Sequence, residues 1–443
     1  MSANNESYLV FTLKCKFLIS ELGNFLMSNY HEEDGDFAQY VEYREVSWFT
    51  RIKEAIQGIG IGFLLIIICF FILIWNEGQT IVNQVAQQAI PISSDVAHNQ
   101  HIGKLVITSG VITSNQTLGD NLFIQPGEYI AIARGVDMYS WVEEQAKDAK
   151  TNVGGSQNQK ITTTYQKRWV QLEDFNRKTS VHGNTNVISR STKSASFVYP
   201  EKHQNPIPTV ENAAYKVNEA KIGVFDLDMS NFALPTSRSV REAYGRAFTG
   251  YVQLPTPTPL QLSQQNLIPT AGVTNVGNYL YKGSGTLASP NVGDLRMRYA
   301  VFNANTNVTV IGKLAENNQI VPYVHRNNHR LYRLFPGTES QALDRVQRED
   351  HLFTWGLRFL SLIFIWLGLR LIAEPMNVIL DFIPIFGSLG RLTTGFSTLI
   401  VALMITISTI VTYHLTQNLV YLAIAVLITF FIANKLFSRR YRT

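Results

Sequence analysis

Cysteine is almost absent from this chain, which has only Cys15 and Cys69 among its 443 residues. Cys69 lies inside an apolar run and Cys15 lies before it, so the long polar part that follows contains no cysteine. A disulfide framework is therefore excluded there, and a domain in that part must depend on its own hydrophobic core.

The common sequence patterns of catalysis are also missing: there is no phosphate-binding loop and no nucleophile elbow. His325 and His329 have the spacing of a helical zinc pair but lack the glutamate between them, and Asp95, His98 and His101 form only a weak metal pattern. We expect no enzymatic activity, no catalytic residues, no cofactor and no metal site.

The excess of positive charge is small, a formal net charge of +5 with a pI near 9.0. The basic residues gather beside apolar runs and are otherwise mixed with acids, which fits lipid headgroups and not nucleic acid. Membrane lipids are therefore expected partners, and nucleic acid is not. Glu143 and Glu144 are adjacent, so a strand would turn them to opposite faces, and we expect both to be solvated.

Residues 58–75 contain no charged side chain at all. At 1.5 Å per residue they cover about 27 Å, close to the roughly 30 Å hydrocarbon core of a bilayer, so they predict a transmembrane helix. The same reasoning predicts three further transmembrane helices at 352–373, 395–413 and 418–434, the last two as a hairpin.

The second predicted span carries two arginines, Arg358 and Arg370. They lie about 18 Å apart along a helix, so each side chain can reach an opposite headgroup layer, with Trp355 at the first interface. The alternative is that either arginine pairs with an acid or lines an ion path. Snorkelling is preferred because the other three predicted spans contain no Asp or Glu.

Lys and Arg flank the first span on its N-terminal side and the last span on its C-terminal side, in the tail 435–443. The positive-inside rule then predicts that both termini are cytoplasmic. Residues 77–351 would lie on the lumenal or periplasmic side. Their short alternating runs, at 104–108, 110–113, 129–133, 136–142 and 295–302, predict a mainly β domain with a flexible hairpin loop at 154–156.

Two segments are expected to lie in the membrane interface. Residues 46–57 place Trp48, Arg51 and Lys53 on or beside one apolar helical face. Residues 374–394, which include Asp381 and Pro384, are apolar but interrupted by Pro and Gly, and a broken backbone cannot face lipid tails. The tail 1–45 gives no structural prediction. The predicted fold class is thus an α+β membrane protein with four transmembrane helices, one before and three after a large mainly β extramembrane domain.

An ordered series of short motifs follows this plan. They are Asn76-Glu77-Gly78, residues 138–143, Tyr165 with Trp169, residues 203–206, residues 293–296, residues 354–358 and Asp381-Phe382-Ile383-Pro384. Together, over about 46–437, they resemble the transmembrane protein 43 (LUMA) family. The resemblance implies a multi-pass protein of the endoplasmic reticulum and inner nuclear membrane in animals, or of the bacterial inner membrane, which is favoured here because no retention signal is apparent.

The same resemblance implies a scaffold that organises membrane protein complexes and self-associates, so a homo-oligomer is expected, with its other membrane-protein partners unknown. Small and hydroxyl side chains at Ser397, Ala402, Thr406 and Ser408 would permit close helix packing. The competing hypothesis is a lipid-binding or ion-conducting membrane protein.

Overall fold

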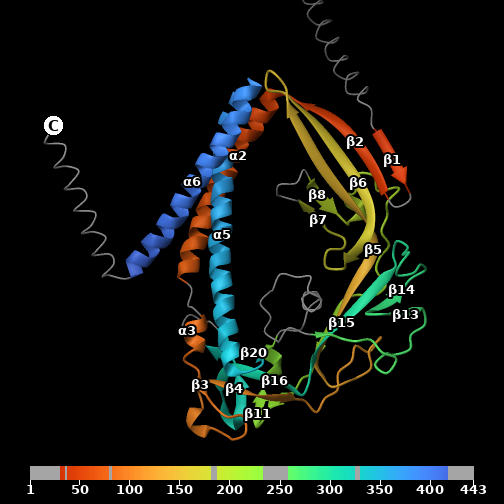
Figure 1. Ribbon diagram of the computed structural model, residues 1–443, viewed down its shortest axis with the longest axis vertical. Coiled ribbons are helices and arrows are strands. Elements are labelled where there is room, and N and C mark those ends of the chain that lie inside the picture. The colour runs from red at the N-terminus through yellow and green to blue at the C-terminus, as the bar shows by residue number, and fades with distance from the viewer. Residues whose placement is uncertain are drawn as a thin grey trace, which may run out of the picture. The chain divides into compact units, whose positions relative to one another are not determined.

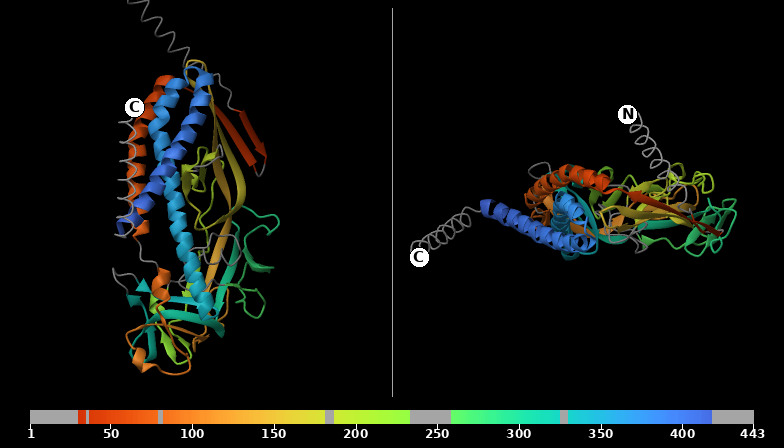
Figure 2. Two further views of the ribbon diagram at one scale, coloured as in Figure 1. Left: turned by 60° about the vertical axis from the view of Figure 1, so that its left-hand side comes forward. Right: turned by 90° about the horizontal axis from the view of Figure 1, so that it is seen from above.

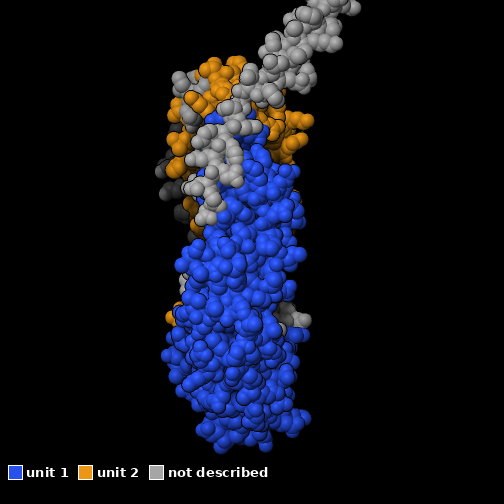
Figure 3. All heavy atoms as spheres, turned by 90° about the vertical axis from the view of Figure 1, so that its right-hand side faces the viewer, with its two compact units in different colours: residues 1–43, 82–148, 160–347 blue, residues 44–81, 149–159, 348–443 orange. Residues whose placement is uncertain are grey.

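The computed structural model describes residues 30–34, 37–78, 82–180, 187–232, 258–324 and 330–417. These residues divide into two compact units (Figure 3). Unit 1 contains residues 1–43, 82–148 and 160–347, and unit 2 contains residues 44–81, 149–159 and 348–443.

The larger sheet, formed mainly by unit 1, has 11 strands among the described residues (Figure 1). Its path is β1 (Tyr30–Asp34), β2 (Phe37–Val46), β6 (Gln157–Gln171), β5 (Tyr129–Thr151), β15 (Leu295–Asn303), β14 (Tyr279–Lys282) and β13 (Val273–Val276). Four shorter strands join beside this path: β7 (Lys178–Ser180), β8 (Val187–Ser191), β9 (Ala213–Lys216) and β12 (Thr258–Pro259). The strand β2 precedes the first long helix, yet it pairs with β6, which follows that helix.

The second sheet of unit 1 closes on itself. Its order is β20 (Arg333–Pro336), β16 (Thr306–Leu314), β17 (Gln319–Val321), β11 (Phe225–Leu227), β10 (Ala220–Ile222), β4 (Leu105–Thr113) and β3 (Ile90–Pro91), and β16 also pairs with β4. The strands β16, β17, β11, β10 and β4 therefore form a ring of five. Side chains that include Ile112, Phe225 and Val310 make its buried core. A separate pair joins β18 (Tyr323–Val324) to β19 (Arg330–Leu331).

A buried polar network centres on Asp120 in unit 1. One carboxylate oxygen accepts the backbone N–H groups of Leu122, Phe123 and Ile124 at 2.7 to 3.0 Å, and the other pairs with Arg134 at 2.5 Å and accepts the Tyr299 hydroxyl. Burial raises the pKa of Asp120, but these donors outweigh it and leave the pKa below its usual value. The carboxylate therefore stays ionised inside a domain that has no disulfide among its described residues.

The sequence runs that alternate between apolar and polar residues are strands in the structure. Residues 104–113 correspond to β4, residues 295–302 to β15, and the two runs between 129 and 142 are parts of one long strand, β5. The predicted loop at 154–156 connects β5 to β6, and Gly154 and Gly155 have φ values of +87° and +81°, which favour glycine. The mixed α+β class with a large β-rich domain is thus confirmed.

The helices of unit 2 are α2 (Trp48–Glu77), the part of α5 (Glu339–Leu380) from residue 348 on, and α6 (Pro384–Gln417), which lie side by side in Figures 1 and 2. The short helix α3 (Val82–Ala86) belongs to unit 1. Each of the three long helices contains a segment long and apolar enough to cross a membrane. The fourth predicted span, 418–434, and the tail 435–443 lie outside the described residues, as do His325 and His329.

The two segments predicted to lie in the membrane interface, 46–57 and 374–394, are mainly helical. Residues 48–57 form the first part of α2 and continue without a break into its apolar part. Ser47 caps this helix, because its hydroxyl accepts the Thr50 N–H at 3.2 Å. Pro375 lies inside α5, so the expected chain break at this proline is wrong, and only residues 381–383 separate α5 from α6.

Candidate functional site

The centre of the helical bundle in unit 2 is apolar and tightly packed. Cys69 of α2, Ile365 of α5 and Ala402 of α6 form its buried core. Gly62 and Gly368 let α2 and α5 approach closely, since a Cβ added to Gly62 would lie 2.5 Å from the Gly368 carbonyl oxygen. Backbones in contact through small residues are a familiar basis of helix association in membranes.

One end of the bundle is closed by a charged cluster around Glu77, the last residue of α2. Its carboxylate accepts hydrogen bonds from Nε and Nη2 of Arg358 in α5, at 2.8 and 2.7 Å. Nε2 of His414 in α6 lies 3.0 Å from the same carboxylate. The Glu77 side chain is only 2% exposed, and Arg358 also lies 4.9 Å over the Trp355 ring. The three helices are therefore joined at this end by one buried carboxylate.

Arg358 has an acidic partner just outside the predicted spans. Glu77 lies two residues beyond residues 58–75 and pairs with the Arg358 guanidinium, and the location of Arg358 at a headgroup layer stays a prediction. The alternative, pairing with an acid, is what the structure contains for Arg358. Arg370 lies 5.6 Å over the Trp366 ring and is half-buried, so the prediction that it reaches the headgroups remains open.

The opposite end of α2 carries a second charged cluster. Arg51 donates to Asp381 at 2.5 Å, and Arg391 of α6 pairs with the same carboxylate oxygen. Arg51 is 8% exposed and Asp381 is 2% exposed, so the pair is buried. Nearby, the Trp48 indole N–H donates to the Val378 carbonyl at 2.9 Å. The predicted candidates Trp48 and Arg51, in α2, are thus brought together with Asp381, in the turn between α5 and α6.

The tip of the β5–β6 hairpin, which belongs to unit 2, completes this cluster. Arg51 donates a second hydrogen bond to the Gly155 carbonyl at 2.6 Å, and the Gly154 N–H donates to the Phe382 carbonyl at 3.1 Å. A Cβ on Gly155 would come within 2.3 Å of the Trp48 ring, so only glycine fits. Residues 149–159 therefore dock on the beginning of α2.

The other predicted interface residues are Lys53, Trp355 and Pro384. Lys53 and Trp355 are exposed, Trp355 to 63%. Pro384 is the first residue of α6 and lies three residues after Asp381. Sequence reasoning missed Glu77, Arg391 and His414 as partners. Of these, only Glu77 carried a signal, as an acid next to the end of a span.

The chemistry of both clusters is that of ion pairing between helices. Arginine presents a planar fork of donors that matches a carboxylate, which suits buried interhelical contacts. In the part of the chain that the structure describes, no group of three or more His, Cys, Asp or Glu side chains is arranged to hold a metal. His98 and His101 lie 6.1 Å apart between ring centres, and His98 stacks on Phe225.

The expected solvation of Glu143 and Glu144 is wrong. The two side chains do occupy opposite faces of β5, but Glu143 is 1% exposed and accepts the Tyr165 hydroxyl and the Val198 N–H, both at 2.5 Å. Glu144 pairs with two arginines, at 2.6 and 2.7 Å. Each carboxylate thus has specific donors that an alternating pattern does not reveal.

Comparison with known proteins agrees with this helical plan. A family model described as Transmembrane protein 43 matches residues 138–418, which include the two helices α5 and α6. The chain belongs to the transmembrane protein 43 family. Transmembrane protein 43 of rat is 22% identical over 82% of this chain and 85% of its own, and the human protein has the same identity and coverage. The Drosophila melanogaster homolog is 25% identical over 73% of this chain and 81% of its own.

No solved structure matches this member of the transmembrane protein 43 family significantly. Membership, together with the apolar helices, makes the chain an integral membrane protein. Most of the sequence motifs that carried the resemblance fall within the matched region, and Asp381 and Arg358 in two of them are members of the two clusters.

The hairpin tip gives a test of membrane sidedness. The charge pattern predicts opposite sides for residues 46–57 and 77–351, whereas the tip at 149–159 contacts Trp48 and Arg51. We expect Glu45→Cys and Val153→Cys to react with an impermeant maleimide from the same side of sealed vesicles, because these contacts hold both segments at one end of α2.

The labelling uses a chain in which Cys15 and Cys69 are replaced by Ser and Ala. Leu122→Cys, at a half-exposed site in unit 1, reports the side of the β domain. Reaction of Glu45→Cys and Val153→Cys from opposite sides would show that the hairpin contacts open when α2 crosses the bilayer.

Proposed function

We propose that this member of the transmembrane protein 43 family is a multi-pass membrane scaffold that organises membrane protein complexes through self-association. One observation carries the proposal: at each end of the bundle, buried charged side chains form ion pairs with one another, and the centre between the two ends is apolar. Such a bundle is a rigid anchor, and the β-rich unit 1 supplies the surface for protein contacts.

The exposed surface of α6 supports self-association through the helices. Ser397 and Ser408 are exposed and lie 11 residues apart, about three helical turns, so they share one face. Ala402 and Thr406 are instead buried within the bundle, so they are unavailable for contacts with a second copy. The first pair could let a second helix approach closely.

We expect the full chain in lipid nanodiscs or mild detergent to be a dimer or larger oligomer by native mass spectrometry at micromolar concentration. Ser397→Leu with Ser408→Leu should shift the population towards monomer. Gly60→Leu is the matched control, because a Cβ at Gly60 meets no atom within 4 Å. A monomeric wild-type protein under all these conditions contradicts the proposal.

A second function, lipid binding, is favoured by one feature of unit 2. A cavity of about 350 Å³ lies beside the α5–α6 turn, lined by Ala373, Met376, Leu380, Leu389, Gly390, Thr393 and Thr394. This lining is mainly apolar and suits an acyl chain. Stoichiometric lipid that co-purifies with the wild type, and is lost in Leu389→Trp but retained in the exposed-site control Met404→Trp, would support it.

Ion conduction is the other form of this alternative. The Arg358 guanidinium is already bound to Glu77, and the bundle centre near Cys69 is apolar, which supports anchoring over conduction in the described helices. Proteoliposomes should therefore leak ions no faster than protein-free vesicles. A reproducible conductance that disappears in Arg358→Gln or Arg370→Gln would favour a channel instead.

A further inference from the structure

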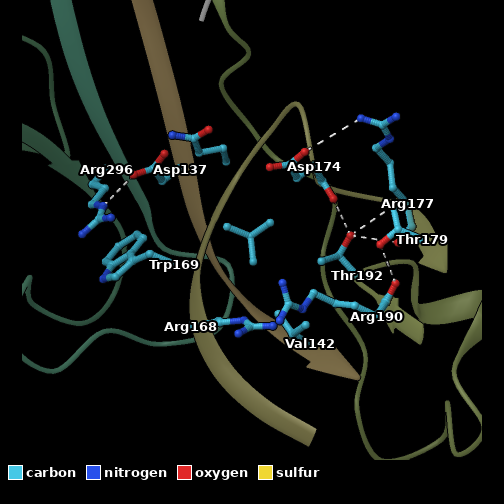
Figure 4. Close-up of a pocket in the computed structure, with 12 residues that line it drawn as sticks. Asp137, Val142, Arg168, Trp169, Asp174, Arg177, Thr179, Arg190, Thr192 and Arg296 are labelled. Atoms are coloured by element: carbon cyan, nitrogen blue, oxygen red, sulfur yellow. Dashed lines mark hydrogen bonds and ion pairs between the residues drawn. The ribbon is translucent and has the colours of Figure 1, made fainter. Parts of the chain in front are cut away.

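Unit 1 contains a cavity of about 480 Å³ where β5, β6 and β15 meet the β7–β8 hairpin (Figure 4). Its lining is Asp137, Val142, Arg168, Trp169, Val170, Gln171, Asp174, Arg177, Thr179, Arg190, Thr192 and Arg296. Four of these residues are arginines and two are aspartates, so the lining carries an excess of positive charge. The volume lies within the roughly 300 to 1,000 Å³ of ordinary small-molecule sites.

Strand pairing places two of the arginines against one carboxylate. The register of β5 with β8 sets Glu144 opposite Arg190, and Arg168 reaches the same carboxylate from β6. Arg168 and Arg190 lie 2.6 and 2.7 Å from the same Glu144 oxygen, and Figure 4 shows the two side chains reaching toward each other.

One carboxylate cannot neutralise two guanidinium groups. Burial raises the pKa of Glu144, but Arg168 and Arg190 outweigh this effect and leave it lowered, so the carboxylate is ionised at neutral pH. Two positive charges then face one negative charge. The Arg168 Nη1 and both Arg190 Nη atoms have no acceptor among the described residues, so these donors remain available to a ligand.

Arg296 and Arg177 extend the positive lining on two sides. Arg296 donates to Asp137 at 2.8 Å and stacks 4.6 Å over the Trp169 ring, which fixes its guanidinium plane. Arg177 lies 3.8 Å from Asp174, and both side chains are about 60% exposed, so this pair is weak. The Thr192 hydroxyl already donates to the Asp174 carbonyl.

We propose that this cavity binds an anion that carries a phosphate group, through the guanidinium groups of Arg168, Arg190 and Arg177. Planar arginine forks match phosphate oxygens in a bidentate way, and a phosphate would supply the negative charge that Glu144 alone does not. Such a group could belong to a soluble phosphate compound or to a lipid headgroup. The proposal is independent of the scaffold function.

The test uses the full chain in neutral detergent at constant ionic strength. Inorganic pyrophosphate is titrated by calorimetry, and short-chain phosphatidic acid is added separately and followed by native mass spectrometry. We expect saturable binding that weakens about tenfold in Arg190→Gln, because one guanidinium group and its charge-assisted hydrogen bonds are removed. Arg177→Gln, at a more exposed position, should weaken binding without affecting the fold.

Lys221→Gln is the matched control, because it removes one exposed positive charge from unit 1 outside the cavity. Arginine-dependent binding of pyrophosphate supports a soluble ligand, and arginine-dependent binding of phosphatidic acid alone supports a lipid headgroup. The proposal is overturned if neither probe binds, or if Lys221→Gln weakens binding as much as Arg190→Gln.

Discussion

Replacing Gly62 by alanine is expected to destabilise the helical bundle by about 2 kcal/mol. The added Cβ would lie 2.5 Å from the backbone oxygen of Gly368 and 2.9 Å from a side-chain carbon of Ile372. A backbone oxygen cannot rotate away, so α2 and α5 must separate. Their separation would loosen the packing of Cys69 and Ile365 in the bundle core.

Gly60, two residues earlier in the same helix, provides the control. A Cβ there meets no atom within 4 Å, so alanine should gain up to about 1 kcal/mol from its lower conformational entropy in the unfolded chain. The two alanine variants should therefore change stability in opposite directions, as measured by denaturant unfolding of the full chain in detergent micelles. Equal effects at the two positions would mean that the α2–α5 crossing is not at Gly62.

Gly368 offers a reciprocal test on α5. A Cβ at Gly368 would lie 2.7 Å from the Gly62 oxygen, whereas one at Gly356 meets nothing within 4 Å. The Gly368→Ala variant should lose stability as Gly62→Ala does, and the double variant should lose less than the sum, because the first substitution already separates the helices.

Local features of the sequence were enough to predict the elements. The uncharged run at 58–75 lies within α2, and the alternation at 295–302 matches β15. Both elements could be predicted because the spacing of apolar residues within one short segment depends on its secondary structure. The order of strands in the sheets was not accessible in this way. The pairing of β2 with β6 joins segments on either side of a long helix, and the sequence contains no local signal for it.

The same limit explains why the contacts at the candidate site were not predicted. Glu77 and Arg358 are 281 residues apart, so their pairing depends on how α2 and α5 pack and not on either helix alone. Glu77 lies two residues beyond the end of the predicted span 58–75, so a search for acids inside the spans does not include it. The sequence indicates Arg51 and Asp381 as interface residues in two different segments. It does not predict the ion pair between them.

The largest effect of a charge change is expected at the Glu77–Arg358 pair. Arg358→Met should destabilise the bundle by about 3 kcal/mol or more, because it leaves a buried carboxylate without its main partner. Glu77 is 2% exposed, and its remaining neighbour His414 is 59% exposed, so solvent-screened His414 cannot replace the guanidinium. The measurement is the free energy of unfolding in micelles, with retention of the folded peak in size-exclusion chromatography.

The paired variant separates the ion pair from simple packing. Glu77→Met with Arg358→Met removes both charges, so no unpaired group remains, and its stability should return to within about 1 kcal/mol of wild type. Arg370→Met is the matched control, since Arg370 stacks on Trp366 and has no ion pair among the described residues. If the double variant were as unstable as Arg358→Met alone, the loss would come from the arginine's packing on Trp355, and the buried carboxylate would not be what joins the three helices.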